Sequence, residues 1–298
     1  MFKAFKNFYE AKYKFLMLFP FLLVVLALLQ ISVQYATTGD FVHKGISLKG
    51  GSTITIEYKP SIIPGELEVY LQQQFPRADI TVRTISSAGK VVSIAVDADA
   101  QEKAEIDALL SVLKQKLALQ EGSYTIEIIG SSLGESFFKQ TITAVAIAFL
   151  LMGIVVFAYF KTPVPSLAVI FAAFSDITVT LAIFNLTGIK LSTAGIAAFL
   201  MLIGYSVDTD ILLTSRVLKR REGTIMDKVY SSIKTGLTMT TTTLAAVLVA
   251  LFLVRSDVVQ QIMIILAIGL VIDMIMTWIQ NVGILRLYLE RKKHESSS

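Results

Sequence analysis

The chain alternates between six long apolar stretches and shorter polar segments. The apolar stretches cover approximately residues 15–33, 138–160, 164–184, 191–215, 235–254 and 259–286. A transmembrane α-helix needs about 20 consecutive, mostly apolar residues, and each of these stretches is near or above that length. The pattern therefore predicts a polytopic α-helical membrane protein with six transmembrane helices, the last five of them within residues 136–286.

The first apolar stretch follows a short segment in which aromatic and basic residues alternate. Residues 1–14 are typical of an amphipathic segment at a membrane surface. The apolar run after them, FLMLFPFLLVVLALLQISV, has about 19 residues, whereas the apolar region of a cleaved signal peptide has about 7–15. We therefore interpret residues 15–35 as a transmembrane helix that is retained.

A polar stretch, residues 36–135, separates the first two spans and has the size of one small domain. Its segments are STITIEY (52–58), PGELEVYLQQQF (64–75), DITVRTIS (79–86), KVVSIAVD (90–97), DAQEKAEIDALLSVLKQKLAL (99–119) and SYTIEIIG (123–130). Alternating, β-branched segments predict strands, a Ser-Ala-Gly turn predicts a hairpin, and apolar residues at helical spacing predict helices. The order β-α-β-β-α-β indicates a ferredoxin-like α+β domain, a fold that serves many functions.

Basic residues set the expected orientation of the spans. They are Lys3, Lys6, Lys12 and Lys14 before the first span, six residues in the loop 216–234, and Arg286, Arg291, Lys292 and Lys293 near the end of the chain. Lysine and arginine accumulate in cytoplasmic loops. With six crossings, both termini, including the tail 287–298, are predicted to be cytoplasmic. The domain 36–135 is then extracytoplasmic, and the cell membrane is the expected location.

Composition narrows the possible chemistry. Hydrophobic residues make up 54% of the chain and charged residues 17%, below the roughly one quarter typical of soluble proteins. The absence of cysteine excludes disulfides, iron–sulfur sites and thiol nucleophiles, and two histidines cannot form a histidine-rich metal site. The net charge of +4 comes from lysines and arginines beside apolar segments, so it does not indicate nucleic-acid binding.

No motif indicates an enzyme. The sequence contains neither a phosphate-binding Walker loop nor an HExxH zinc motif, and we expect no cofactor and no metal. Any work that the protein performs must then draw its energy from a partner or from an ion gradient rather than from a nucleotide bound by this chain.

Four aspartates lie inside the predicted helices: Asp176, Asp208, Asp210 and Asp273. Placing such a residue at the centre of a membrane helix costs about 2.5–3.5 kcal/mol on insertion scales. Intramembrane acids therefore usually face the interior of the bundle, a partner or water. Two interpretations remain open from the spacing alone. The acids could form a functional network, or they could be polar groups that hold the helices together or lie at a helix end near the headgroups.

Helix geometry suggests how deep these groups lie. At about 1.5 Å per residue, Asp208 is about 12 Å from Arg216 at the cytoplasmic edge, and Thr241 and Thr242 are at a similar height above Lys234. We therefore expect a lower polar layer that joins Asp208 or Asp210 to the threonines of the fifth helix.

Asp176 and Asp273 would form an upper layer, each about 20 Å from its cytoplasmic end. Lys234, Thr238 and Thr242 fall on one helical stripe. The threonine hydroxyls have two possible roles, binding a carboxylate or a water chain, or binding the backbone of their own helix.

Asp208 and Asp210 are about 200° apart around a helix, so both cannot face one partner. One is expected to face the bundle and the other a second subunit or the cytoplasmic rim. Such acids and hydroxyls are compatible with a proton path.

Several segments together resemble the SecF members of the SecD/SecF family of protein-export membrane proteins. These segments are GISLKGGSTITIEY (45–58), IGSSLGESFFKQTI (129–142), GYSVDTDILLTSRVLKR (204–220) and KTGLTMTTTTLAA (234–246). They carry the paired glycines Gly50 and Gly51, the motif Gly204, Tyr205, Ser206 with Arg216 downstream, and a threonine-rich fifth helix. The matches cover most of the chain in the order of the family.

The resemblance implies half of an RND-type bundle that pairs with a SecD-like subunit of six further helices. Members of the family assist a translocating polypeptide at the Sec translocon and are thought to use the proton-motive force. Two departures stand out. The motif of the bacterial members, Gly-Tyr-Ser-x-Asn-Asp-Thr, places its aspartate on Thr209 here, and their arginine at the start of the fifth helix falls on Lys234 or Thr235. Both features are more similar to the archaeal branch.

Other functions remain as alternatives. The chain could be half of an RND-type exporter of small molecules or lipids, or a structural scaffold among membrane lipids. The exposed strands of the domain 36–135 could bind an extended chain by edge pairing, or the domain could be a spacer that orients a partner.

Overall fold

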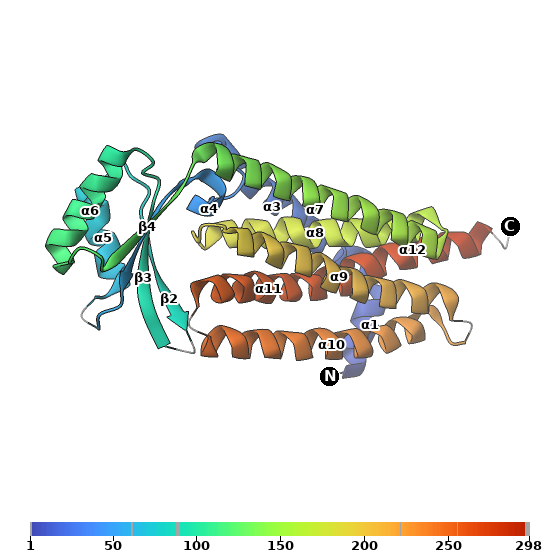
Figure 1. Cartoon of the computed structure of the whole chain (residues 1–298). Coiled ribbons are helices and arrows are strands. Elements are labelled where there is room, and N and C mark those ends of the chain that lie inside the picture. Colours follow the sequence, from blue (N-terminus) through green and yellow to red (C-terminus); the bar gives the residue numbers. More distant parts are fainter. Residues whose placement is uncertain (1, 61, 88–89, 221, 255, 296–298) are drawn as a thin grey trace.

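The computed structural model describes residues 2–60, 62–87, 90–220, 222–254 and 256–295. It consists of a long helical bundle with a small α/β domain at one end (Figure 1). The helices are α1 (Phe2–Ala11), α2 (Tyr13–Leu16), α3 (Leu18–Thr38), α4 (Ile46–Lys49), α5 (Pro64–Gln74), α6 (Lys103–Leu117), α7 (Ser131–Phe160), α8 (Pro163–Leu186), α9 (Thr193–Lys219), α10 (Ile225–Leu253), α11 (Asp257–Ile275), the π-helical turn η1 (Met276–Asn281) and α12 (Val282–Glu295). The strands are β1 (Gly51–Glu57), β2 (Thr81–Ser87), β3 (Lys90–Ala98) and β4 (Tyr124–Ile129).

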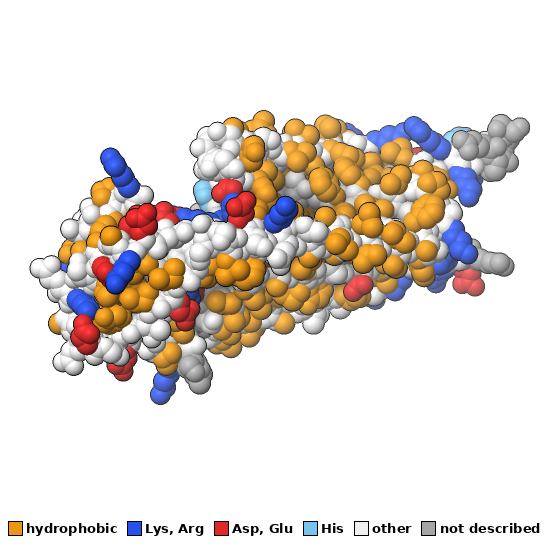
Figure 2. All heavy atoms as spheres, turned by 45° about the horizontal axis from the view of Figure 1, so that its top comes forward, with side chains coloured by type: hydrophobic (Ala, Val, Ile, Leu, Met, Phe, Trp, Pro, Cys, Tyr) orange, Lys and Arg blue, Asp and Glu red, His pale blue; other side chains and the backbone are white. Residues whose placement is uncertain are grey.

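The predicted six spans are confirmed within this described part of the chain. Six helical segments are long and apolar enough to cross a membrane: Tyr13–Thr38, Ser131–Phe160, Pro163–Leu186, Thr193–Lys219, Ile225–Leu253 and Asp257–His294. The second helix begins at Ser131 rather than at residue 138. Hydrophobicity marks only the apolar part of this helix, and its first turns are polar. Figure 2 shows apolar side chains over the middle of the bundle, with most charged side chains at its two ends and on the domain.

The bundle is built around α8, α9 and α11, whose residues are much more buried than those of α7 and α10. The centre is closely packed: Phe184 of α8, Leu202 of α9 and Ile265 of α11 are fully buried in one apolar cluster. The outer helices expose large apolar side chains such as Leu150 and Phe252. Such surfaces are stable only against lipid or another protein.

The small domain has the predicted β-α-β-β-α-β order. Its four strands form one antiparallel sheet in the order β2-β3-β1-β4, with Ile54 opposite Val96 on one side and Ile126 on the other. The helices α5 and α6 cover the face that lies away from the bundle (Figure 1) and enclose an apolar core that includes Leu71 and Leu113. This is the ferredoxin-like arrangement. Residues 88–89 of the predicted hairpin turn lie outside the described residues.

The paired glycines Gly50 and Gly51 lie where the chain enters the domain and crosses the start of α7. Their φ angles of 87° and 146° are ones that residues with a Cβ rarely adopt. A Cβ on Gly50 would lie 2.6 Å from the Cα of Ser131, and one on Gly134 would lie 2.5 Å from the nitrogen of Gly50. The two segments therefore touch through their backbones, which explains why both of them need glycine.

A second contact fixes the domain to the bundle. Asp79, in the domain, accepts hydrogen bonds from Lys49 and from Lys190, which lies in the loop between α8 and α9. Partial burial alone would raise the pKa of Asp79, but the two lysines outweigh it and hold the pKa below its ordinary value of 3.8. The loop also pairs with the entry to the domain, because Gly45 donates from its backbone nitrogen to Leu191 at 2.8 Å.

The N-terminal helix α1 packs across the opposite end of the bundle (Figure 1). Arg286 of α12 donates to the backbone oxygen of Glu10 at 2.8 Å. Tyr230 of α10 donates to the side chain of the same residue at 3.0 Å. The amphipathic segment is thus bound to two other helices at this end.

Candidate functional site

Three of the four intramembrane aspartates meet inside the bundle. Asp176 comes from α8, Asp210 from α9 and Asp273 from α11, and none of the three has any exposed surface. The helices that carry them are the ones at the centre of the bundle. At about 1.5 Å per residue, Asp210 is about 14 Å along α9 from Lys219, which places the cluster well inside the apolar span.

Hydroxyl groups of α9 bind two of the carboxyls. Ser206 donates to Asp176 Oδ2 at 2.5 Å. Thr209 Oγ1 lies 3.0 Å and 3.2 Å from the two carboxyl oxygens of Asp273. One turn of α9 therefore holds Asp176 on one side and Asp273 on the other.

Thr277 connects the remaining carboxyl to the cluster. Its Oγ1 lies 3.0 Å from Asp210 Oδ1 and 3.1 Å from Asp273 Oδ1. Asn281 Nδ2 donates to the same oxygen of Asp210 at 2.6 Å. Because a hydroxyl has one hydrogen and accepts through its lone pairs, Thr277 can donate to one carboxyl and accept from the other only when that second carboxyl is protonated. The arrangement is thus able to share and pass a proton.

The π-helical turn η1 brings these groups into position. Its wider turn, with hydrogen bonds that reach one residue further than in an α-helix, runs from Met276 to Asn281. Thr277 and Asn281 lie four residues apart across this turn, and both contact the same oxygen of Asp210. Single π-turns of this kind are frequent at functional sites.

No cation compensates the cluster within the described residues, since no salt bridge reaches any of the three carboxyls. Asp176 Oδ1 and Asp210 Oδ2 are buried without a hydrogen-bond partner in the same part of the chain. A buried, unpaired negative charge is strongly destabilising. The surroundings therefore disfavour a state in which all three carboxyls are ionised.

The expected division into two polar layers is wrong. Asp210 belongs to the same cluster as Asp176 and Asp273, to which Thr277 connects it. The threonines of the fifth helix are not part of it: Thr238 donates to the backbone oxygen of Lys234 at 2.8 Å, and Thr242 donates to that of Thr238 at 2.7 Å. Lys234, Thr238, Thr241 and Thr242 are all exposed.

The reason is the rotation of α10. This helix turns Gly236, Thr240 and Val247 toward the bundle, and a Cβ on Gly236 would lie 2.2 Å from the ring of Trp278. The glycine lets α10 approach the end of α11–η1 closely, and the opposite stripe of threonines then points away from the acids. Their hydroxyls follow the alternative of bonding to their own helix.

Asp208 and Asp210 are separated as their spacing predicts. Asp208 is exposed, and so are Met201, Gly204 and Tyr205 on the same face of α9. No atom lies within 4 Å of the position that a Cβ on Gly204 would take. Of the Gly-Tyr-Ser motif, only Ser206 points inward, where it donates to Asp176.

Arg216 connects α9 to α10 rather than binding an aspartate. Its Nη1 donates to the backbone oxygen of Ser231 at 2.7 Å and to Thr235 Oγ1 at 2.9 Å. Thr235 is one of the two positions on which the arginine of the bacterial members' fifth helix falls, so in this chain the arginine at that position is replaced by one that reaches it from α9.

The sequence did contain a signal for the residues that were missed. Thr277 and Asn281 follow Asp273 at intervals of four within an apolar span, which is the spacing of one helical face. Thr209 lies between the two aspartates of α9 and was identified only as the aligned position of a missing carboxylate. Its hydroxyl instead contacts the carboxyl of Asp273.

Comparisons with known proteins agree with this architecture. Residues 110–291 match the family model described as protein export membrane protein SecD/SecF, C-terminal. The chain is 40% identical over 281 residues to the protein-export membrane protein SecF of Pyrococcus furiosus, covering 94% of this chain and 92% of that protein. It is 39% identical over 287 residues to SecF of Methanothermobacter thermautotrophicus, covering 93% of each.

A solved structure has the same fold. The crystal structure of SecDF, a translocon-associated membrane protein from Thermus thermophilus, superposes with a TM-score of 0.72 at 18% identity and covers 94% of this chain. This chain spans only 38% of the length of SecDF.

Proposed function

The chain belongs to the SecF family of protein-export membrane proteins and has a SecF-like role in protein translocation; from this premise we propose that its buried aspartates couple that role to the proton-motive force. The observation that carries the proposal is the position of Thr277 between Asp210 and Asp273. One hydroxyl serves two buried carboxyls, and it can satisfy both only when one of them holds a proton. A proton arriving or leaving then changes which of these contacts is made.

The cluster supports coupling for a second reason. No cation of the described residues binds the three carboxyls, and they compete for few hydrogen-bond donors, so their contacts depend on how many protons they share. The acids lie on three different helices. Loss of one proton would change the packing between α8, α9 and α11, which is the kind of local electrostatic change that moves a bundle between two arrangements.

We place the end of the bundle that carries α1 and α12 in the cytoplasm. Arg220, Lys228 and Lys292 lie at that end, and lysine and arginine are enriched on the cytoplasmic side. The small domain is then extracytoplasmic and the protein lies in the cell membrane. The strand β4 is one edge of the sheet, and all of its residues are exposed or half-buried. We infer that this edge receives an extended translocating polypeptide by strand pairing.

The proposed partner is a SecD-like subunit of six further helices, since this chain spans 38% of the length of SecDF. The exposed face of α9 supports this choice. A carboxyl such as that of Asp208 is costly toward lipid, and Gly204 beside it leaves room for a helix to approach closely. A second subunit with a hydrogen-bond donor at this level would bind the carboxyl of Asp208 and pack against Gly204. Through it, the chain would act at the Sec translocon.

The test replaces Asp273 by asparagine in cells that depend on this chain and measures export of a reporter with a signal sequence. Coupling predicts slow export with a normal amount of the assembled complex. Asp107→Asn, which changes an exposed carboxyl in the domain, is the matched control. A second measurement records proton entry into vesicles that hold the purified complex. Normal export by a variant in which Asp176, Asp210 and Asp273 are all asparagine would overturn the proposal.

A further inference from the structure

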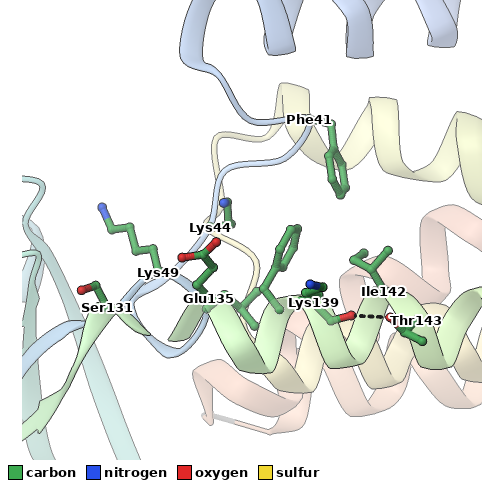
Figure 3. Close-up of a pocket in the computed structure, with 10 residues that line it drawn as sticks. Phe41, Lys44, Lys49, Ser131, Glu135, Lys139, Ile142 and Thr143 are labelled. Atoms are coloured by element: carbon green, nitrogen blue, oxygen red, sulfur yellow. Dashed lines mark hydrogen bonds between the residues drawn. The ribbon is translucent and has the colours of Figure 1, made fainter. Parts of the chain in front are cut away.

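A hollow of about 550 Å³ lies where the small domain meets the bundle, away from the aspartate cluster. It is lined on one side by the segment between α3 and β1 and on the other by the first turns of α7 (Figure 3). Its lining residues are Phe41, Lys44, Leu48, Lys49, Ser131, Glu135, Phe138, Lys139, Ile142 and Thr143.

The depth of the hollow follows from the length of α7. This helix has 30 residues, and about 20 residues are needed to cross the hydrocarbon of a membrane. Counting about 20 residues back from Lys161, at the far end of α7, leads to residue 141. Lys139 and Ile142 therefore lie at the boundary between hydrocarbon and headgroups, and Glu135 and Ser131 lie further out. The hollow is at the level of lipid headgroups on the side of the domain.

The charges in the hollow are only partly compensated. Lys44 forms a salt bridge with Asp40 at 2.6 Å, and Lys49 is bound to Asp79. The side chains of Lys139 and Glu135 have no ion-pair or hydrogen-bond partner among the described residues. They are four residues apart on α7, the spacing at which a glutamate and a lysine commonly pair, yet they do not pair here.

The remainder of the lining is apolar. The rings of Phe41 and Phe138 are 5.5 Å apart and form the inner wall. Lys44 lies over the ring of Phe138, with its nitrogen 4.6 Å from the ring centre. Ile142, one turn further along α7, continues this apolar surface toward the middle of the membrane. A molecule that fits must therefore combine a charged group at the headgroup level with an apolar part that extends toward the bilayer.

We propose that this hollow binds one membrane phospholipid, whose phosphate contacts Lys139 and Lys44 and whose acyl chain lies along Phe138 and Ile142. Glu135 accepts a hydrogen bond from a donor on the headgroup, an amine or a hydroxyl. The chemistry that is recognised is thus a phosphodiester that carries a donor. This binding site is independent of the proton coupling proposed above and lies on a different part of the surface from the exposed face of α9.

The geometry favours a lipid over a protein segment. A phospholipid brings an anionic group to the level of Lys139 and an apolar chain to Ile142 within one molecule, which is the combination that the lining presents. The volume of about 550 Å³ is within the range of ligand pockets, about 300–1,000 Å³. Lysines near a membrane surface contribute about 1 kcal/mol each to binding of anionic lipids.

The experiment measures lipid bound to the purified full chain by native mass spectrometry after transfer from detergent. The probes are phosphatidylglycerol and phosphatidylethanolamine, which carry a donor, and phosphatidylcholine, which carries none. We expect Lys139→Gln to weaken binding of phosphatidylglycerol about fivefold, which corresponds to the loss of one lysine beside an anionic lipid, and to weaken binding of the two zwitterionic lipids less. Lys59→Gln removes the same charge from an exposed position in the domain and should leave binding unchanged.

Glu135→Gln tests whether Glu135 binds the hydrogen-bond donor of the lipid headgroup. We expect this variant to reduce the preference for phosphatidylethanolamine over phosphatidylcholine while it keeps the binding of phosphatidylglycerol. Equal lipid binding by Lys139→Gln and Lys59→Gln would overturn the proposal. So would a photo-crosslinker at position 139 that captures a protein subunit instead of lipid in intact membranes.

Discussion

Asp208 and Asp210 are two residues apart on α9 and have opposite surroundings. Asp210 is fully buried and accepts a hydrogen bond from Asn281 at 2.6 Å. Asp208 is exposed beside Gly204, on a face that the described chain leaves open. The two carboxyls therefore face different surroundings, the interior of this chain and the open face at which we propose a second subunit.

The first prediction uses this pair. We expect Asp210→Asn to slow export of a reporter protein while the complex stays assembled, because the amide keeps the shape of the cluster but holds no exchangeable acid proton. Asp208→Asn should instead reduce the amount of partner subunit that co-purifies. Both variants replace one carboxyl by an amide on the same helix. Identical effects of the two substitutions on assembly and export would contradict the separation of roles.

The second prediction concerns Thr277. Replacing it by valine removes the hydroxyl shared by Asp210 and Asp273. Asp210 then keeps Asn281 as a donor and Asp273 keeps Thr209, so the loss of stability is about 0.5–1.5 kcal/mol for each hydrogen bond removed. Export should fall to the level of the Asp273→Asn variant. Thr277→Ser keeps the hydroxyl and should retain most of the activity. Thermal unfolding of the purified chain measures the first effect, and reporter export measures the second.

The third prediction tests the crossing of the domain entry over α7. Gly134→Ala places a Cβ 2.5 Å from the nitrogen of Gly50, in a contact between two backbones that cannot easily yield. Overpacking of this kind costs about 1–3 kcal/mol. Gly65→Ala, in α5, meets nothing within 4 Å and should be neutral or stabilise by about 0.4–1 kcal/mol. Equal unfolding temperatures for the two variants would show that the crossing is loose.

The fourth prediction concerns pH and the attachment of the domain. Hydrogen bonds from Lys190 and Lys49 outweigh partial burial and lower the pKa of Asp79 in the folded protein. Its stabilising contribution is therefore complete above the ordinary value of 3.8 and is lost as the pH falls through the lowered value. Asp79→Asn should loosen the domain already at neutral pH.

Spin labels on the domain and on the bundle measure this attachment, and the absence of cysteine from the chain simplifies their placement. The distance distribution of the wild type should broaden only in strong acid, below pH 3.8. That of Asp79→Asn should be broad throughout. A wild-type distribution that broadens between neutral pH and this value would show that another group controls the attachment.

The sequence was sufficient to predict the six spans and the order of elements in the domain, because both depend on periodicity and length. The rotation of each helix about its own axis was harder to predict. Lys234, Thr238 and Thr242 do form one stripe as predicted, but Gly236 seats α10 against Trp278 and turns that stripe outward. The hydropathy of a stripe of threonines does not show whether that stripe faces the interior of the bundle or its surface.

The sequence predicted the aspartates of the cluster but not their arrangement. The aspartates were identified from their cost in a membrane, whereas the depth estimate separated Asp210 from Asp273 into different layers. The basic residues that end each helix do not lie at one common depth, because the helices differ in length and in their offset along the bundle. The π-helical turn, which brings Asn281 to Asp210, has no composition that distinguishes it from the α-helix on either side.

The connection between β4 and α7 has a mechanical consequence. A single residue, Gly130, separates the last residue of the sheet edge from the first residue of a 30-residue helix. A joint so short leaves little slack, and the crossing at Gly50 and Gly134 removes much of what remains. A tilt of α7 relative to the other helices is therefore expected to carry the sheet with it, against the contact that Asp79 makes with Lys190.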